Sequence, residues 1–302
     1  MRARRTPVGL LAATLALALA GCAAAADGGP ERARDAAETD PTLHAQLPPE
    51  VRDAGVLTVA TDATYAPASF FGPDGRTVVG FEADLATAVG DVLGVDVEFV
   101  VTGFDELLDD VDAHRVDVAM SAMTDTPDRQ RRADFVNYFR AGTSILVQRG
   151  NPRAIADLAD LCGEVVAVES GTVQVDLLER SQRRCAGGQP ITVSTYPTNA
   201  DALVELRTGR AAAVLNDYPP AAYLTTDPRT QADYQLASDT QYEPGLYGVA
   251  VARDRRELRD AVQSALERLL ASGVYREILR TWDVDDGAVD TVTVNGGAPA
   301  GG

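Results

Sequence analysis

Residues 80–101 read GFEADLATAVGDVLGVDVEFVV and join two apolar patterns end to end. Apolar residues first recur at helical spacing, which predicts a helix over 80–93 that Gly94 stops. Alternating apolar residues then predict a strand over 95–101. A helix followed directly by a strand is the repeating unit of α/β proteins. The helical set is Phe81, Leu85, Ala88, Val89 and Val92, and the strand set is Val95, Val97, Phe99 and Val101.

The same alternation continues on both sides of this unit. It predicts α/β architecture with mostly parallel sheets, in which ligands sit beyond the carboxyl ends of the strands. Strands are expected at 56–61, 116–120, 143–148, 164–168, 191–194 and 211–215. Helices are expected at 104–113, 172–183, 198–208 and 255–272, with a short one that starts at Thr126-Pro127.

Polar residues follow four of these strands. The four segments are 62–67, 121–129, 169–172 and 216–217. Arg129 can hold a carboxylate through two parallel bonds, and a glycine at a helix start, as at Gly171, suits an anion. Asp217 could face a cation. Each has a plainer explanation, a solvated arginine or a helix-capping aspartate. Together they suit a zwitterion, and an α-amino acid is the simplest one.

Composition excludes other classes of function. The net charge of -18 and the pI of about 4.4 make nucleic acid a poor partner. The only histidines are His44 and His114, and no CxxC pair occurs, so we expect no metal site and no Cys/His catalysis. We also expect no cofactor.

The first residues have the pattern of a targeting signal. Three arginines precede the apolar run 8–20, which is too short to span a bilayer. Leu19-Ala20-Gly21-Cys22 resembles a bacterial lipobox, with an ordinary secretory signal as the alternative. We expect a signal peptide over 1–21, a lipid on Cys22 that anchors the protein outside the cell membrane, and a flexible tether over 22–50. The Gly-rich end, 287–302, is expected to be disordered.

Two cysteines remain once Cys22 is assigned to the anchor. In an oxidising compartment Cys162 and Cys185 are expected to form a disulfide, with two free thiols as the alternative.

Five segments together make the sequence recognisable. It resembles the family 3 periplasmic solute-binding proteins of ABC-type amino-acid importers over about 55–284. The motifs are Asp62 to Pro67, Gly80 to Leu85, Ser121 to Arg129, Gly171-Thr172 and Gly209-Arg210 to Asp217.

The resemblance implies a type II periplasmic-binding-protein fold. Two lobes joined by two crossing strands close over a ligand by a hinge motion. Lobe 1 is expected over 51–142 plus 243–286 and lobe 2 over 143–242. The implied partners are a free amino acid and a membrane permease, and the implied state is a monomer.

The resemblance also assigns roles to single residues. Arg129 is expected to bind the ligand α-carboxylate, and Asp217 the α-ammonium. Ser121 and Thr124 assist Asp217, with backbone groups from Ala122, where relatives often carry a hydroxyl or glycine. From lobe 2, the α-carboxylate is met by Gly171, Thr172 and Val173. Tyr65 and Phe104 are expected to pack on the ligand.

The choice of amino acid depends on Asp62 and Glu169, which the resemblance places against the ligand side chain. Two carboxylates in one closed pocket suit a cation. We therefore favour arginine, lysine or ornithine, with glutamine next if Glu169 points to solvent.

Two other functions share this fold. An enzyme of the cyclohexadienyl dehydratase type would use a carboxyl group such as that of Glu169 or Asp62 as acid or base. A ligand-sensing receptor domain would need a docking partner. The Arg129 and Asp217 pair and the lipobox favour a tethered binding protein with no catalytic residues.

Overall fold

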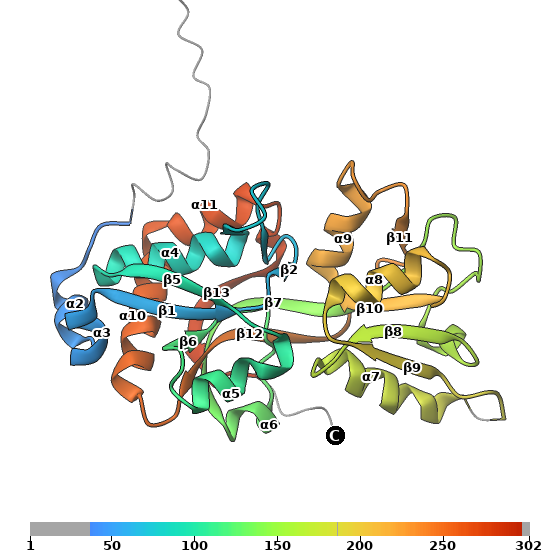
Figure 1. The fold of residues 1–302 in the computed structure, drawn as a ribbon, viewed down its shortest axis with the longest axis horizontal. Helices are drawn as coiled ribbons and strands as arrows, with labels where there is room; N and C mark the ends of the chain where they lie inside the picture. Colours follow the sequence, from blue (N-terminus) through green and yellow to red (C-terminus); the bar gives the residue numbers. More distant parts are fainter. Residues whose placement is uncertain (1–36, 186, 298–302) are drawn as a thin grey trace, which may run out of the picture.

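The chain folds into two α/β lobes that lie side by side and are joined by two long strands (Figure 1). The structure is a computed structural model and describes residues 37–185 and 187–297. The joining strands are β7 (Ala133–Gln148) and β12 (Tyr242–Ala252). They pair antiparallel with each other. β12 also pairs with a strand of lobe 1 and β7 with a strand of lobe 2, so one continuous sheet runs through both lobes.

Lobe 1 has a parallel sheet at its centre. β1 (Val56–Thr61) pairs with β5 (Asp96–Val101) on one side and β6 (Val118–Ala119) on the other. Two separate apolar cores cover its two faces. One forms under α4 (Phe81–Leu93), α10 (Arg256–Ser272) and α11 (Val274–Thr281). The other forms under η1 (Phe104–Glu106) and α5 (Leu107–Asp112). Close to the cleft lie α6 (Pro127–Gln130) and the small sheet β2 (Thr64–Tyr65), β3 (Ser69–Phe71) and β4 (Val78–Val79).

Lobe 2 repeats this plan. β8 (Val165–Glu169) pairs in parallel with β9 (Thr192–Tyr196) and β10 (Ala213–Asp217). The helices are α7 (Val173–Ser181), α8 (Asn199–Arg207) and α9 (Tyr218–Thr226), and β11 (Tyr234–Leu236) pairs with β7. Two short 3-10 helices, η2 (Leu158–Leu161) and η3 (Gln182–Arg184), precede the two cysteines of a Cys162–Cys185 disulfide, which confirms that prediction.

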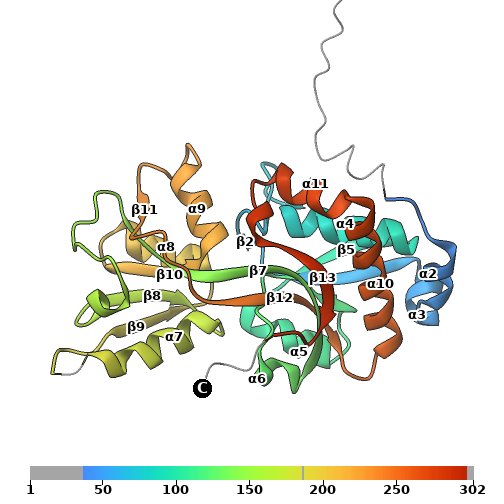
Figure 2. The ribbon, with the colours of Figure 1, turned by 180° about the vertical axis from the view of Figure 1, so that it is seen from behind.

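The parallel order explains where the functional residues lie. The carboxyl ends of β1 and β6 in lobe 1, and of β8 and β10 in lobe 2, all point toward the gap between the lobes (Figures 1 and 2). The helix predicted at 80–93 ends at Gly94, whose left-handed conformation (φ 69°) caps it. Thr126 caps α6 and Pro127 starts it, also as predicted.

Two expectations about the ends of the chain are wrong. The segment expected to be a flexible tether contains α2 (Pro41–Gln46) and the start of α3 (Pro49–Ala54). Leu47 and Val51 beside them are 2% exposed in the core of lobe 1, and this burial holds the segment in place. The segment expected to be a disordered tail, 287–302, begins at the last residue of η4 (Asp285–Gly287) and contains β13 (Ala288–Val294), which pairs with β7.

Residues 1–36, which include Cys22 and the expected signal peptide, lie outside the described residues. Among helices of the described part, none combines the length and the apolar character that a membrane span requires.

Candidate functional site

A hollow lies between the lobes where the strand ends converge. The residues that line it are Asp62, Tyr65, Phe104, Ser121, Ala122, Thr124, Arg129, Glu169, Thr172, Val173, Gln174 and Asp217. Lobe 1 supplies the first seven and lobe 2 the last five. A ligand held here would therefore contact both lobes at once.

Arg129 is the cation of this hollow. Its Nη1 donates to Thr124 O at 2.7 Å, and its Nη2 reaches across the gap to Gly171 O at 2.9 Å. Its guanidinium carbon lies over the Phe104 ring, 5.3 Å from the ring centre, within the range of a cation–π contact. Burial lowers the pKa of Arg129 to about 10, so it remains charged at neutral pH. Both partners are carbonyls, and no ion pair to Arg129 is formed within residues 37–185 and 187–297.

Asp217 is the anion on the opposite side. It is 5% exposed at the end of β10, where it begins α9. Tyr65 of lobe 1 donates its hydroxyl to Asp217 Oδ2 at 3.2 Å and accepts the Asp217 N–H at 2.9 Å. Gln174 donates to Oδ1 at 2.8 Å. Burial raises the pKa of Asp217 to about 6, so the group is mostly ionised at neutral pH and ready to receive a cation.

Acidic side chains gather at one wall of the hollow. Asp62 is 4% exposed and its Oδ1 accepts from Thr64 N at 2.7 Å and from Thr64 Oγ1 at 2.6 Å. Glu169 is 6% exposed, and its Oε1 has no hydrogen-bond partner among the described residues. Burial, then the charge of Asp62, raises the pKa of Glu169 to about 9, and the charge of Asp105 adds to this. At neutral pH Glu169 is therefore protonated and neutral beside Asp62. A cation bound between the two groups would favour the ionised form of both.

A buried carboxylate holds the wall of lobe 1 in shape. Glu82, in the first turn of α4, is 1% exposed and accepts from Ala122 N at 2.7 Å, from Ser69 Oγ at 2.9 Å and from the Tyr138 hydroxyl. Ala122 has a φ of 48°, and the bond to Glu82 fixes it in this uncommon conformation. Ser121 beside it accepts from Asp62 N at 2.9 Å. Glu82 thereby sets the positions of Ser121 and Ala122.

The structure gathers almost every site residue that the sequence predicted. The exception is Gly171, which does not line the hollow but supplies the carbonyl that Arg129 reaches. Its φ of 73° and the 3.1 Å that would separate an added Cβ from Asp105 Cβ explain the glycine. Thr172 caps α7 and turns its hydroxyl back to Glu169 O at 2.8 Å.

Sequence reasoning missed Gln174 and Asp105. Gln174 lies in the first turn of α7, and a lone glutamine gives no signal of an Asp217 contact that spans 43 positions. Asp105 reads as an ordinary residue at a helix start, yet it accepts from Ser170 Oγ at 3.3 Å across the gap. The first contact joins two elements within lobe 2, and the second appears only when the two lobes are placed together.

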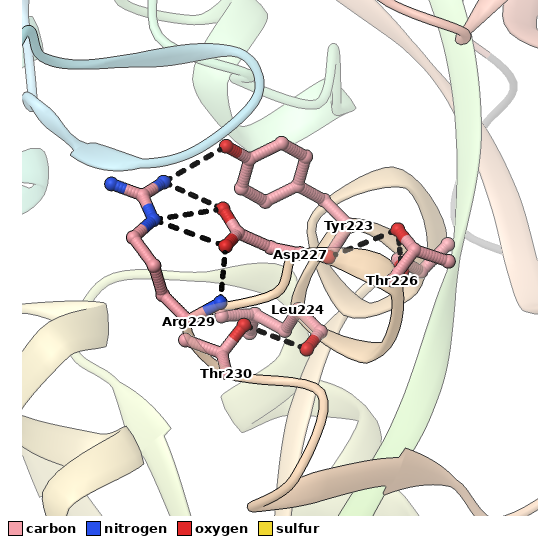
Figure 3. Close-up of polar contacts among 7 residues, drawn as sticks. Tyr223, Leu224, Thr226, Asp227, Arg229 and Thr230 are labelled. Carbon is pink, nitrogen blue, oxygen red and sulfur yellow. Dashed lines mark hydrogen bonds and ion pairs between the residues drawn. The ribbon is translucent and has the colours of Figure 1, made fainter.

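A second contact between lobes lies away from the hollow. Phe70 of β3 in lobe 1 packs against Tyr223 of α9 in lobe 2, with ring centres 6.3 Å apart, and edge-on against Trp282 at 5.9 Å. Figure 3 shows what orients Tyr223: Arg229 donates to the Tyr223 hydroxyl at 3.2 Å while it grips the carboxylate of Asp227 at 2.6 Å. The Arg229 side chain holds the pKa of Asp227 well below its usual range.

No group of His, Cys, Asp and Glu that could hold a metal ion occurs in the described part of the chain. Two α/β lobes, two crossing strands and a polar hollow between them define a two-lobed ligand-binding protein. Residues 57–285 match the bacterial extracellular solute-binding proteins, family 3, and the chain belongs to this family.

Two relatives of known name are amino-acid-binding proteins. The chain is 29% identical over 258 residues to the arginine-binding protein ArgT of Corynebacterium glutamicum, covering 84% of this chain and 83% of that protein. It is 29% identical over 234 residues to the L-cystine-binding protein TcyJ of Escherichia coli K12, covering 77% of this chain and 84% of that protein.

Solved structures are similar too. An ancestral arginine-binding protein bound to arginine has a TM-score of 0.69 and 33% identity, covering 76% of this chain and 98% of that chain. The ancestral amino acid-binding protein AncCDT-1, described as a precursor of cyclohexadienyl dehydratase, has a TM-score of 0.67 and 31% identity, covering 77% of this chain and 97% of that chain.

Proposed function

We propose that the protein is the extracytoplasmic substrate-binding protein of an ABC-type amino-acid importer. It binds a basic L-amino acid, with arginine, lysine or ornithine favoured and glutamine next, and delivers it to a membrane permease when its lobes close. We propose further that a lipid on Cys22 tethers the protein to the outer face of the cell membrane and that it acts as a monomer.

The opposed charges in the hollow support an α-amino acid. Arg129 donates to two carbonyls and forms no ion pair with a carboxylate among the described residues, so its charge suits the ligand α-carboxylate. Thr172 and Val173 begin α7 from the other lobe, where free N–H groups favour the same anion. Asp217 suits the α-ammonium. An ammonium and a carboxylate on one carbon match this pairing.

A basic side chain is supported by one observation above all, the unpartnered Oε1 of Glu169. A buried acceptor without a donor costs free energy, and a guanidinium or ammonium supplies the missing donor together with a positive charge. Asp62 and Asp105 add negative potential at the same place. A neutral ligand such as glutamine supplies a donor but no charge.

The test is isothermal titration of the purified protein, freed of co-purified ligand, with arginine, lysine, ornithine and glutamine. We expect the three basic amino acids to bind more tightly than glutamine. Substituting Glu169→Gln should weaken arginine by ~2 kcal/mol or more, because one partner of a buried charge pair is lost. Glutamine binding should change by less than about 0.5 kcal/mol.

Glu179→Gln is the matched control, since Glu179 lies exposed on the same helix that follows Glu169. It should leave the affinities for arginine and for glutamine unchanged. Equal weakening of arginine and glutamine by Glu169→Gln would contradict the basic-ligand assignment. No binding of any amino acid would contradict the function itself.

A second candidate function is a dehydratase of the cyclohexadienyl type, favoured by the protonated state of Glu169. A neutral carboxyl group in a closing cleft is what a general acid requires. Incubation with a cyclohexadienyl substrate, followed by absorbance of an aromatic product, decides this alternative. Product formation that Glu169→Gln abolishes would establish it, and the absence of product at high protein concentration would remove it.

A further inference from the structure

The last described residues, 295–297, form a strap on lobe 1, beyond the residues that match the family. Asn295 pairs with Phe135 of β7 in both directions: Asn295 N donates to Phe135 O, and Phe135 N donates to Asn295 Oδ1, both at 2.8 Å. Gly296 N donates to Asn137 Oδ1 at 2.9 Å. These bonds extend the β13–β7 pairing seen in Figure 2 toward the turn that precedes α6.

The carboxylate of Asp125 joins this strap to α6. Its Oδ2 accepts from Gly297 N at 2.8 Å and from Asn137 Nδ2 at 3.0 Å, and its Oδ1 accepts from Gln130 Nε2 at 2.7 Å. Asp125 is 2% exposed, so these bonds are shielded from water. Gln130 is the residue after Arg129. One buried group thus connects the last described residues to the short helix that carries Arg129.

The fit of the strap admits only glycine where it meets this turn. A Cβ on Gly297 would lie 2.1 Å from Asp125 O, and one on Gly296 would lie 2.9 Å from Asn137 Oδ1. Carbon and oxygen atoms that are not bonded do not approach so closely, so any side chain at 297 displaces the strap or the turn. The glycines at this point are therefore a requirement of close backbone packing.

We propose that the strap positions Arg129 for the ligand carboxylate. Both the backbone and the side chain of Arg129 donate hydrogen bonds to the turn that contains Asp125. Arg129 N donates to Thr126 Oγ1 at 3.3 Å, and Nη1 donates to Thr124 O at 2.7 Å. A shift of that turn moves the guanidinium relative to Gly171 in the other lobe. This inference rests on the proposed binding of an amino acid and assigns Asp125, Gln130 and Gly297 as positioning residues.

The test compares Gly297→Ala with Gly188→Ala, a control in which the added Cβ meets nothing closer than Cys185 O at 3.7 Å. L-arginine and its carboxamide, which lacks the charged carboxylate, are each titrated at a temperature well below the melting of every variant. We expect Gly297→Ala to weaken arginine about tenfold, as for the loss of one charge-assisted hydrogen bond. The carboxamide should change far less, since it does not engage Arg129 as an ion, and Gly188→Ala should leave both Kd values unchanged.

Gln130→Met is the second variant, because it removes the bond to Asp125 at a half-buried position without overpacking and should fold even if Gly297→Ala does not. It should show the same selective loss for arginine. Equal weakening of arginine and the carboxamide, or an unchanged arginine Kd in both variants, overturns the positioning role while wild-type binding keeps the proposed function. Wild-type protein that binds no amino acid overturns both.

Discussion

Glu169 combines two properties at the scale of a single residue: burial at the end of β8 and an oxygen without a partner in the described chain. Four ionisable groups surround it from other elements. They are Asp62 after β1, Tyr65 in β2, Asp105 in η1 and Asp217 at the end of β10. The three carboxyl groups all oppose its ionisation. Its charge state should therefore depend on whether a cation is bound.

We predict that binding of a basic amino acid releases a proton. With a pKa of about 9, Glu169 of the free protein is protonated at neutral pH, and a bound cation favours its ionised form. Affinity should therefore rise as pH rises toward about 9. It should fall as pH drops through about 6, where Asp217 becomes protonated in the free protein. Titration in buffers of different ionisation enthalpy measures the protons released.

Two comparisons make this prediction specific. Glu169→Gln should remove the proton release above pH 6 and leave the loss of affinity in acid, which belongs to Asp217. Glutamine, which brings no side-chain charge, should release fewer protons than arginine. Tight arginine binding with no proton release at neutral pH would show that Glu169 is already ionised in the free protein.

The sequence reveals which residues gather in the hollow, because each follows a predicted strand and parallel strands end at the same edge. It does not reveal their states. Nothing in the local sequence indicates that Tyr65 pairs with Asp217 or that Oε1 of Glu169 lacks a donor. Those facts depend on the distance between two lobes, which no local pattern encodes.

At the scale of elements, the helices and strands of the α/β repeat were predictable because their apolar periods are strong. β1 was predicted over its observed range, and α4, α8 and α10 within a residue or two. The two ends of the chain were mispredicted, because proline and glycine there suggest disorder. In fact Pro41 and Pro49 start helices, and Gly296 and Gly297 allow close packing. The full length of β7 was also not anticipated, since its polar residues interrupt the apolar run at the crossing between lobes.

The disulfide allows a prediction at this scale. Cys162–Cys185 closes a loop of 23 positions that contains β8 and α7, and Cys185 packs against the core of lobe 2. Replacing both cysteines by alanine should lower the free energy of unfolding by about 3 kcal/mol, mainly by releasing the unfolded chain. Urea denaturation measures this loss.

Arginine affinity should be unaffected by the same double substitution, because apolar residues of β8 and α7 hold Glu169 and Thr172 in place. Titration with arginine, without denaturant and at a temperature at which both proteins are fully folded, provides the comparison. A large loss of affinity would mean that the disulfide, and not the core, fixes the β8–α7 turn.

At the scale of the whole molecule, contacts other than the ligand hold the lobes together. Arg129 reaches Gly171 O, Ser170 reaches Asp105, and Phe70 packs on Tyr223. The first two pairs lie at or beside the hollow, but the aromatic pair lies apart from it. A ligand shifts the equilibrium between the open and closed states only by binding one of them more tightly. Contacts that stabilise the closed state of the free protein reduce the free energy that the ligand must supply for closure, and so they raise the measured affinity.

We therefore predict that Tyr223→Ala favours the open state of the free protein. Loss of an aromatic pair worth ~0.5–1.5 kcal/mol should weaken arginine by a factor of roughly 2 to 12, although Tyr223 does not line the hollow. Tyr223→Phe keeps the ring and loses only the bond from Arg229, so it should retain most of the affinity. Small-angle X-ray scattering should show a larger radius of gyration for free Tyr223→Ala than for the wild type, and equal radii when both are saturated with arginine. Equal radii in the free state, with unchanged Kd, would mean that closure is set in the hollow alone, by Arg129, Asp217 and the ligand between them.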